Sequence, residues 1–321
     1  MSARRTRKKR KSGWKIFVIA AAVLIAAAAV CWYIAGVSLY GRISHEQAGA
    51  EGAGALRQGG VTNILLIGND SRENGEDGRS DAMILISISS KTKTVQMISL
   101  LRDMYVEIPG HDGNRLNAAY AYGGPQLLME TVEENFGIPV SRYVQVNFEA
   151  FANLVDAVGG VDLELTAEEV EYVNGYLVEY NQLTGRPEGT DYLDTSQSGL
   201  IHLNGPQALA YTRNRYIGTD FGRTERQRKV LSAVIDGLPG ALLTNPKEVL
   251  DGLLSNLTTN LTQGEFLRLT LDAGKLFAYD LQQGSVPVEG SYQNATIRGM
   301  AVLEVDFGRN IEYLRRRIYG E

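Results

Sequence analysis

Cysteine and histidine, which build many metal sites, are scarce in this 321-residue chain. A lone cysteine, Cys31, excludes an intrachain disulfide and a zinc site made of cysteines. The three histidines (His45, His111 and His202) lie far apart and indicate no metal cluster. The chain also lacks the G-x-G-x-x-G and G-x-x-x-x-G-K-[S/T] patterns, so it carries neither the dinucleotide signature nor the P-loop signature.

Basic residues become scarce after the first fifteen positions. Residues 1–15 hold eight Lys and Arg and no acid, whereas the rest of the chain has 24 basic and 37 acidic residues. Of those 24, only five are lysines and 19 are arginines, whose planar fork suits phosphate. A GC-rich genome produces the same skew, so the arginine excess alone decides nothing.

An uncharged run of 22 residues, 16–37, follows the basic block. A bilayer core needs about 20 such residues in a helix, whereas the apolar core of a cleaved signal peptide has roughly 7–15. Val30 before Cys31 also makes a poor lipoprotein cleavage site. We therefore expect an uncleaved transmembrane signal anchor over residues 16–38, with Trp14 and the Trp32–Tyr33 pair near the interfaces.

The basic block sets the expected topology. Positive residues favour the cytoplasmic side, so residues 1–15 are expected as a cytoplasmic tail and the remainder outside the cell. A nuclear or nucleic-acid signal is the competing interpretation, which the adjacent membrane span disfavours. Residues 39–60 are small, polar and rich in Gly and Ala, as in a linker, and residues 61–321 are expected as the outer domain.

Expected strands and helices alternate along the outer domain. Strand patterns occupy residues 61–68, 81–89, 94–100, 141–148, 161–165 and 299–306, with a short extended segment at 104–110. Helices are expected at 117–137 (broken at 123–125), 149–160, 204–213, 223–238, 245–257, 262–277 and 310–320. Residues 166–199 are expected as a helix followed by a long loop. This alternation predicts an α/β sandwich.

Two aspartates flank the first expected hairpin. Asp70 follows the first strand and Asp81 opens the second, so antiparallel pairing brings both to one sheet edge. Two carboxylates there suit a hard divalent ion such as Mg²⁺, together with phosphate oxygens. Alternatively, Asp70 caps a turn and Asp81 pairs with a neighbouring Arg72 or Arg79. Periodicity alone favours neither interpretation.

A charged pair, Arg102–Asp103, interrupts the next apolar stretch. An interior charge has to be paired or used, so the pair is either a structural ion pair or an arginine directed into a site. Arg115 precedes an expected helix start, where backbone amides and a cation can both meet an anion. The alternative for that position is a surface arginine beside a capping Asn117.

Five arginines lie between residues 213 and 228. Arg223 and Gln227 are four residues apart and share a helical face. Arg223 also lies near the start of its helix, where positive charge is unfavourable without an anion. That placement favours a bound anion over a solvated helix face. Arg226 and Arg228 lie on other faces and are expected to be structural or surface residues.

An ordered series of seven segments resembles the LytR-CpsA-Psr (LCP) family. The segments are NILLIGNDSR, GRSDAMIL, SLLRDMYVEIPG, RLNAAYAYGG, DAVGGVDLEL, HLNGPQALAYTRNR and DFGRTERQRKV. They cover roughly residues 61–230 behind a single N-terminal anchor, and the closing strand and helix also fit. Individually most are weak signals, but the seven in order are highly specific.

The resemblance implies a mixed central β-sheet sandwiched between α-helices, with a polyprenyl tail in a hydrophobic pocket beneath a pyrophosphate site. It implies a phosphotransferase that moves a glycopolymer (teichoic acid, capsule or another secondary wall polysaccharide) from an undecaprenyl-pyrophosphate carrier onto a peptidoglycan hydroxyl. The implied partners are that lipid-linked glycan, peptidoglycan and the membrane, without nucleic acid. The implied location is the cell membrane, with residues 61–321 as an extracellular catalytic domain. A polyprenyl-pyrophosphate phosphatase and a membrane-bound transcriptional attenuator remain alternatives.

The resemblance also implies roles for single residues. Asp70 and Asp81 become the ligands of Mg²⁺ (or Mn²⁺). The implied pyrophosphate site comprises Arg79, Arg102, Arg115, Arg213, Arg215, Arg223 and Gln227. The implied catalytic residues are Asp70, Arg102, Asp103 and Arg223, and the base for the acceptor hydroxyl is either Asp70 or Asp103. Two departures from the family pattern are Asn69, where a small or aliphatic residue is common, and Leu101, which replaces a proline.

Overall fold

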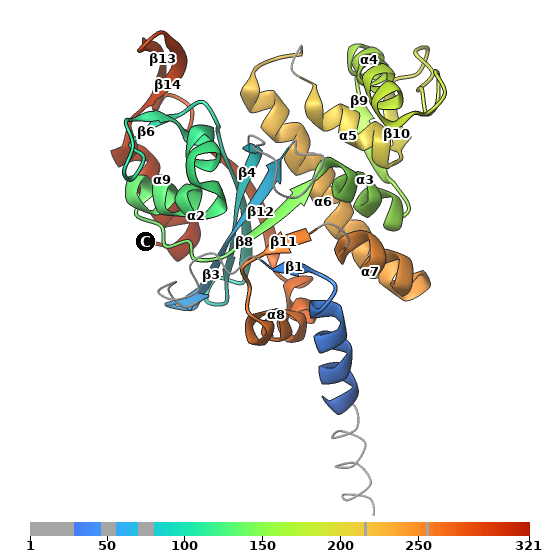
Figure 1. Cartoon of the computed structure of the whole chain (residues 1–321), viewed down its shortest axis with the longest axis horizontal. Coiled ribbons are helices and arrows are strands. Elements are labelled where there is room, and N and C mark those ends of the chain that lie inside the picture. Colours follow the sequence, from blue (N-terminus) through green and yellow to red (C-terminus); the bar gives the residue numbers. More distant parts are fainter. Residues whose placement is uncertain (1–28, 46–55, 70–79, 215–216, 255–256) are drawn as a thin grey trace, which may run out of the picture.

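The computed structural model describes residues 29–45, 56–69, 80–214, 217–254 and 257–321. Its centre is a mixed sheet of eight strands in the order β1-β11-β8-β3-β4-β5-β12, with β2 paired to β3 (Figure 1). The strands are β1 (Ser44–His45), β2 (Arg57–Gln58), β3 (Val61–Asn69), β4 (Ser80–Ser89), β5 (Thr94–Leu100), β8 (Tyr143–Asn147), β11 (Leu257–Thr259) and β12 (Asp280–Val286).

Both strand directions occur in this sheet. Strand β4 is antiparallel to β3 and to β5, whereas β8 is parallel to β3 and β12 is parallel to β5. Three antiparallel strand pairs lie outside this sheet in the described residues: β6 (Tyr105–Val106) with β7 (Asn114–Arg115), β9 (Val161–Leu165) with β10 (Gly199–Leu203), and β13 (Tyr292–Ile297) with β14 (Met300–Val305). The expected mixed α/β architecture is confirmed.

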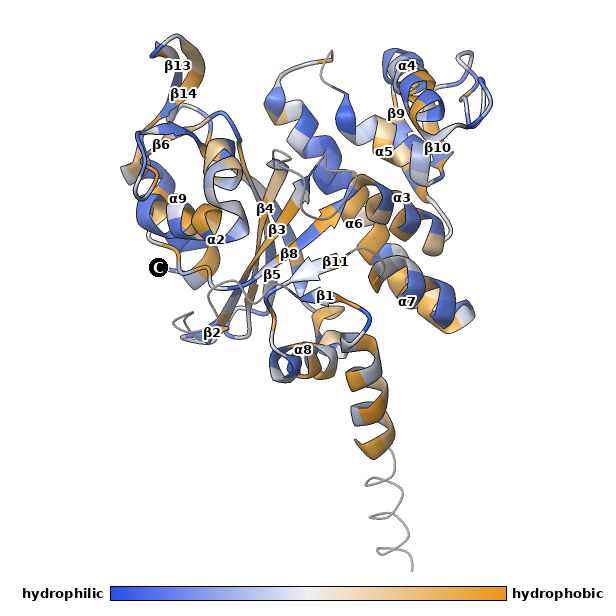
Figure 2. Ribbon diagram, in the orientation of Figure 1, coloured by the Kyte–Doolittle hydropathy of each residue, from blue (hydrophilic) through white to orange (hydrophobic). Residues whose placement is uncertain are grey.

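Helices cover both faces of the sheet (Figure 1). They are α2 (Leu116–Phe136), α3 (Phe148–Ala157), α4 (Ala167–Thr184), α5 (Gly205–Arg213), α6 (Asp220–Thr244), α7 (Pro246–Leu254), α8 (Gln263–Leu276) and α9 (Phe307–Tyr319). Helices α2 and α9 pack on one face, in a core that includes Leu65, Leu85 and Leu314. Helices α3, α5 and α6 lie on the other face and join α4, β9 and β10 in a second core that includes Val155 and Val230. The apolar colouring of β3, β4 and β8 in Figure 2 reflects this double coverage.

The chain enters the domain through a helix over residues 29–40, which lies against α8 (Figure 1). The Tyr40 hydroxyl donates to the carbonyl of Leu261 at 3.0 Å, and the rings of Tyr40 and Phe266 are 5.8 Å apart. None of the helices in the described residues is long and apolar enough to cross a membrane. Residues 1–28, and with them most of the expected anchor, lie outside the described residues.

Several expected elements need correction. Residues 245–257 are not one helix, because α7 ends at Leu254 and β11 begins at Leu257. Helix α6 is longer than expected and runs from Asp220 to Thr244, with Pro239 inside it. Strands β10, β12 and β13 follow no clear apolar alternation and were not predicted. Within the segment expected as a linker, β1 and β2 join the main sheet, so the folded domain includes residues before Val61.

Candidate active site

The site forms where β3 ends and β4 begins. Antiparallel pairing of the two strands is confirmed, with Asn69 opposite Ser80, and it places Asp81 at the sheet edge. Three residues predicted for the site, Asp70, Arg79 and Arg215, lie outside the described residues. The remaining predicted residues come together from β4, the segment after β5, β7, α5 and α6.

Arg102 connects two of the predicted carboxylates. Its Nη1 atom lies 2.7 Å from Asp81 Oδ1, and its Nε atom lies 3.5 Å from Asp103 Oδ2. Arg115 Nη1 donates to Asp103 Oδ1 at 3.2 Å. Strand β5 ends at Leu100, so the Arg102–Asp103 pair follows the strand and does not interrupt it. The ion pairs hold Arg102 at the sheet edge, beside the residues of the anion site.

The start of α6 supplies the second half of the site. The side chain of Arg223 is only 3% exposed, and its Nη2 atom lies 3.0 Å from Asp220 Oδ1. One turn further along, the Oε1 atom of Gln227 is buried with no hydrogen bond in the described part of the chain. Arg223 and Gln227 line a cavity of about 40 Å³ together with Asp81 and Arg213. The structure thus gathers four of the predicted site residues around one small polar space.

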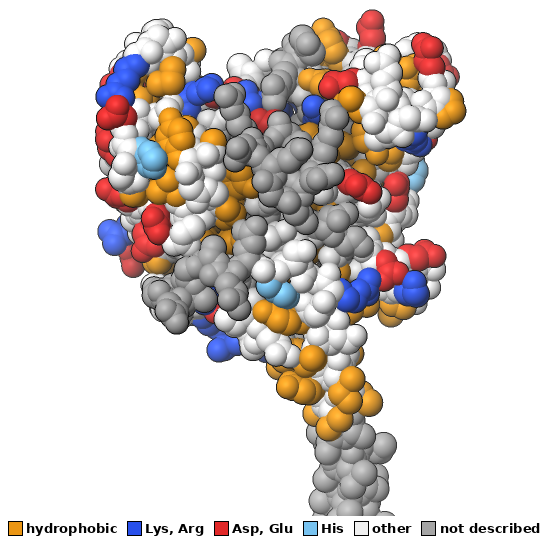
Figure 3. Space-filling model, viewed as in Figure 1, with side chains coloured by type: hydrophobic (Ala, Val, Ile, Leu, Met, Phe, Trp, Pro, Cys, Tyr) orange, Lys and Arg blue, Asp and Glu red, His pale blue; other side chains and the backbone are white. Residues whose placement is uncertain are grey.

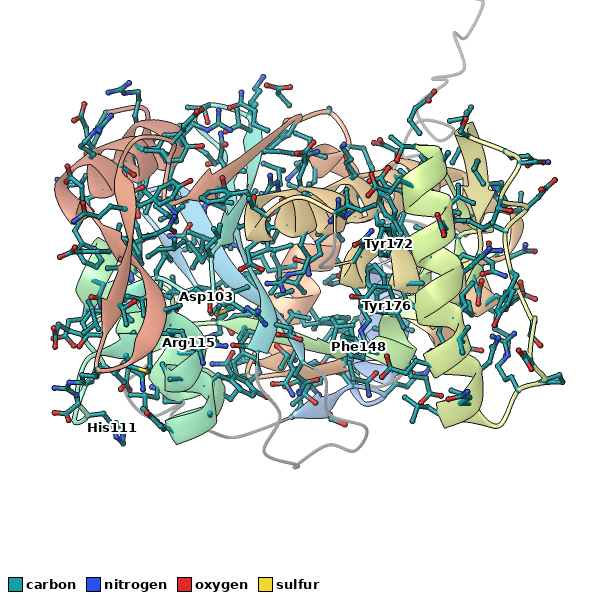
Figure 4. All side chains as sticks on the ribbon, turned by 90° about the horizontal axis from the view of Figure 1, so that it is seen from above. Asp103, His111, Arg115, Phe148, Tyr172 and Tyr176 are labelled. Carbon is teal, nitrogen blue, oxygen red and sulfur yellow. The ribbon has the colours of Figure 1, made fainter. Side chains whose placement is uncertain are left out.

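Arg213 is held by aromatic rings. Its guanidinium carbon lies 4.7 Å from the centre of the Phe148 ring and 5.8 Å from that of Tyr176. Among the described residues, no carboxylate lies within ion-pair distance of Arg213. Seen from above, Phe148 and Tyr176 lie on the α4 side of the site, and Asp103 and Arg115 lie on the opposite side (Figure 4). The aromatic faces orient Arg213 without neutralising its charge.

Arg226 and Arg228 have structural roles, as expected from their helical faces. Arg226 donates to the carbonyls of Asn214 and Ile217, at 2.9 Å each. Arg228 donates to Ser99 Oγ at 2.6 Å, and burial lowers the pKa of its guanidinium. Both side chains are buried, which excludes the alternative of surface residues.

An apolar pocket of about 230 Å³ lies directly under the polar cavity, between the sheet and helices α3, α5 and α6. Its walls include Leu66 and Ile84 from the sheet and Leu154 and Leu231 from the helices. Five residues line both spaces: Gly68, Ala82, Phe148, Thr212 and Gln227. The two spaces therefore adjoin, with charged groups at one end and apolar side chains at the other.

Small residues keep the junction between the two spaces open. Gly68 is opposite Ala82 in the β3–β4 ladder. A Cβ atom added to Gly68 would lie 3.1 Å from Ala82 Cβ, which is tighter than ordinary van der Waals contact. Larger side chains at this pair would close the passage from the polar cavity to the apolar pocket.

Asp103 and Asp220 form a carboxyl pair that the sequence did not predict. Burial raises the pKa of Asp103, and the hydrogen bond between the Asp103 and Asp220 carboxyl groups raises it further. The positive charges of Arg102 and Arg115 lower this pKa and oppose both effects. The sequence analysis assigned Asp220 no role in the site. The local signal was its position, three residues before Arg223 at the start of the same helix.

Of the two metal ligands that the resemblance implies, the structure describes Asp81. Its carboxylate offers the oxygen ligands that Mg²⁺ prefers, and it lines the polar cavity. Among the described residues, no group of three or more His, Cys, Asp and Glu is arranged to hold a metal ion. The predicted second ligand, Asp70, lies outside them, so the pair stays a prediction.

Comparison with families and curated proteins gives consistent matches. The model of the LytR_cpsA_psr family matches residues 37–311. A polyisoprenyl-teichoic acid–peptidoglycan teichoic acid transferase TagU from Enterococcus faecalis is 36% identical over 220 residues, covering 67% of this chain and 66% of that protein. The enzyme of the same name from Bacillus cereus is 39% identical over 206 residues, covering 63% and 61%. The chain therefore spans less than two thirds of the length of these relatives.

Solved structures share the fold. The structure described as TagT bound to LI-WTA has a TM-score of 0.66 and 27% sequence identity, and the match covers 85% of this chain and 99% of that one. The LytR-CPS2A-psr family protein YwtF (TagT) with bound octaprenyl pyrophosphate lipid has a TM-score of 0.62 and 26% identity, with the same coverage.

Proposed function

Because the chain belongs to the LytR_cpsA_psr family, we propose that it is a phosphotransferase that moves a glycopolymer from an undecaprenyl-pyrophosphate carrier onto a hydroxyl of peptidoglycan. The observation that carries this proposal is the apolar pocket that opens into a cavity lined by arginines. Such a pair of spaces suits a ligand with a long apolar tail and a compact, multiply charged head. The names of the relatives and the lipid in one neighbouring structure support the same ligand class.

The donor is proposed to bind across the junction of the two spaces. Its polyprenyl tail occupies the apolar pocket, where burying apolar surface is favourable by about 25 cal/mol per Å². Its pyrophosphate lies among the arginines and the glutamine proposed for this role: Arg79, Arg102, Arg115, Arg213, Arg215, Arg223 and Gln227. Arginine forks match phosphate oxygens in pairs, so several of them fix the head group in one orientation.

The proposed reaction is a displacement at the phosphorus that carries the glycan. The oxygen of the acceptor hydroxyl forms a new bond to that phosphorus, and the bond to the bridging oxygen breaks. The lipid monophosphate leaves with the electron pair, and the hydroxyl proton passes to a carboxylate. Arg102 and Arg223 stabilise the charge that accumulates on the leaving phosphate, which is the main task of a phosphoryl-transfer enzyme.

Asp103 is the described residue best suited to accept that proton. A carboxylate with a raised pKa is a stronger base than an ordinary one. Asp70 stays the other candidate. Asp70 and Asp81 are the residues that would hold Mg²⁺ (or Mn²⁺), which when bound would neutralise phosphate charge.

The membrane topology is part of the proposal. Residues 16–38 form the transmembrane anchor, residues 1–15 stay in the cytoplasm, and the catalytic domain lies outside the cell at the membrane surface. Residues 29–38, the part of the proposed anchor that the structure describes, support that placement, because the apolar side chains of Val30, Tyr33 and Ile34 are exposed. This helix is predominantly apolar along its visible length (Figure 2).

A reconstituted reaction tests the activity. The 321-residue chain in lipid nanodiscs is given Mg²⁺, a polyprenyl-pyrophosphate-linked saccharide and soluble peptidoglycan fragments. Acceptor-linked glycan phosphate and soluble glycan phosphate are then measured separately. We expect the wild-type protein to form the acceptor-linked product. Exclusive release of soluble glycan phosphate would instead assign it as a phosphatase.

Substitution of the proposed arginines links this activity to the site. Arg102→Ala and Arg223→Ala are expected to lower transfer by about 10²–10³-fold, the usual effect of removing one charged contact from a transition state. Arg315→Ala, which changes an exposed arginine of α9, is the matched control and should retain full activity. Unfolding temperatures establish that the variants are folded. Wild-type rates in folded Arg102→Ala and Arg223→Ala proteins would contradict the proposed site.

A further inference from the structure

A groove of about 340 Å³ lies beside the site, between the β13–β14 hairpin and the first turn of α6. Asp103 and Asp220 form one part of its wall, and Phe221, Tyr292 and Asn294 form another. None of the residues that line it lines the apolar pocket or the polar cavity beneath the arginines. The groove is therefore a separate space that reaches the site from another direction.

Two arginines connect the wall of the groove with the wall of the polar cavity. Arg102 contacts Asp81, which lines the cavity, and also Asp103, which lines the groove. Arg223 lines the cavity and contacts Asp220, which lines the groove. Arg102 lines neither space itself but pairs with a carboxylate of each, and Arg223 lines the cavity and pairs with a carboxylate of the groove. A phosphorus atom held by them would be accessible from the groove on one side and bonded to the lipid phosphate on the other.

The lining of the groove suits a neutral ligand that is rich in hydroxyl groups. The rings of Phe221 and Tyr292 stack with their centres 5.1 Å apart and present an apolar surface. The two carboxylates accept hydrogen bonds from hydroxyl groups, and the Asn294 amide both donates and accepts. A phosphate would be repelled by Asp103 and Asp220, so the groove does not suit the charged head of the donor.

The hairpin is attached to the rest of the domain by a backbone bond to Asp103 and an ion pair at its turn. The backbone N–H of Leu303 donates to the carbonyl oxygen of Asp103 at 2.8 Å. At the turn of the hairpin, Arg298 Nη1 lies 2.8 Å from Asp112 Oδ2. The Leu303 bond therefore holds the β14 wall of the groove beside Asp103, as a binding site that positions a reacting group requires.

We propose that this groove binds the acceptor saccharide and directs one of its hydroxyl groups to Asp103 and to the phosphorus held by Arg102 and Arg223. This inference rests on the proposed transferase function and identifies the acceptor side of the same site. The acceptor oxygen then enters opposite the leaving lipid phosphate, as an in-line displacement at phosphorus requires. Tyr292 and Asn294 are positioning residues for the acceptor.

The test is the dependence of transfer on acceptor concentration in two groove variants. Tyr292→Ala removes the aromatic surface, and Ala301→Trp fills the groove from an exposed position of β14. We expect the KM for soluble peptidoglycan fragments to rise about five-fold in Tyr292→Ala, the usual effect of one lost stacking contact, and further in Ala301→Trp, which fills the groove. The KM for the lipid-linked donor should not change.

Gln293→Ala is the matched control. Gln293 precedes Asn294 in the same strand, does not line the groove, and donates to Glu304 Oε2 at 2.6 Å on the neighbouring strand. Its removal should leave both KM values unchanged. Release of soluble glycan phosphate without acceptor gives a second readout, which should be unchanged in all three variants because water needs no saccharide site.

The outcomes separate this inference from the proposed function. If the wild-type protein transfers glycan but Tyr292→Ala and Ala301→Trp have the wild-type acceptor KM, the groove assignment is wrong and the transferase function stands. A rise in acceptor KM for Tyr180→Ala alone would place the acceptor in the space between α3 and α4, which Tyr180 lines. If the wild-type protein transfers glycan to no acceptor, the proposed function fails first.

Discussion

The two faces of the central sheet consist of the same strands but are filled differently. On the face covered by α2 and α9, Leu65 and Leu85 are fully buried in a continuous apolar core. On the opposite face, their neighbours Leu66 and Ile84 line a pocket of about 230 Å³. Successive side chains of a strand point to opposite faces, so each strand serves a filled core and an open pocket at once.

This difference shows where the molecule uses its sheet for stability and where for binding. Close packing on the α2–α9 face gains both hydrophobic burial and dispersion contacts. The pocket on the other face forgoes part of that gain, and the small pair Gly68 and Ala82 keeps its mouth open toward the arginines. Figure 3 shows several Lys and Arg side chains in the upper part of the molecule, between the β13–β14 hairpin and α4.

Substituting the two adjacent leucines of β3 gives the largest expected difference between the faces. Leu65→Ala should lower the free energy of unfolding by about 3–5 kcal/mol, because it leaves a cavity in a filled core. Leu66→Ala should cost about 1–2 kcal/mol, because its side chain already borders an open pocket. Urea denaturation of the two variants measures both values. Equal losses would show that the two faces are equally packed.

Narrowing the mouth of the pocket separates binding from stability. Ala82→Phe should lower transfer about 100-fold, because a ring at the junction displaces the donor head group from the arginines. The unfolding temperature should stay close to that of the wild type, since the new ring enters open space. Transfer rate and thermal unfolding are measured on the same preparation. A fully active variant would mean that the donor does not pass between Gly68 and Ala82.

The carboxyl pair predicts a pH effect. The pKa of Asp103 is raised by its burial and by Asp220, and a base must be ionised, so transfer should fall as the pH drops through that raised pKa. Asp220→Asn removes the second contribution and should move this acidic limb to lower pH. The pH dependence of kcat/KM for both proteins is the measurement. An unchanged limb would remove Asp103 from the role of base.

The smallest expected effect comes from the aromatic support of Arg213. Tyr176→Leu removes one of the two rings near its guanidinium but keeps an apolar side chain. A cation–π contact at a partly exposed site is worth about 0.5–1 kcal/mol, so the donor KM should rise about two- to five-fold. The acceptor KM should be unaffected. Steady-state kinetics with each substrate varied in turn distinguish the two constants.

Local patterns were sufficient for the elements around the site proposed for the donor. Two β-rich runs predicted the antiparallel pair of β3 and β4, and Gly123–Gly124–Pro125 predicted the kink inside α2, where Gly124 has a φ of 63°. The spacing of Arg223 and Gln227 placed them on one face of α6, where both line the polar cavity.

The groove proposed for the acceptor and strand β12, which does not line it, were not predicted, because contacts between distant segments of the chain create both. Strand β12 is polar at Gln282 and Gln283 and is stabilised by pairing with β5, far away in the sequence. Strand β13 likewise has no apolar alternation, so the sequence did not predict the strand that places Tyr292 and Asn294 in the groove. Such strands are specified by their neighbours in space, which a local reading of the chain does not contain.

Photo-crosslinking of the donor tests the difference between the two faces most directly. A polyprenyl pyrophosphate with a photoreactive group on its tail is bound to the 321-residue chain in nanodiscs, and the crosslinked peptides are identified by mass spectrometry. We expect crosslinks at pocket residues of α3 and α6, such as Phe151, Leu154 and Leu231. Crosslinks confined to α2 and α9 would show that the tail binds the other face and would contradict the account.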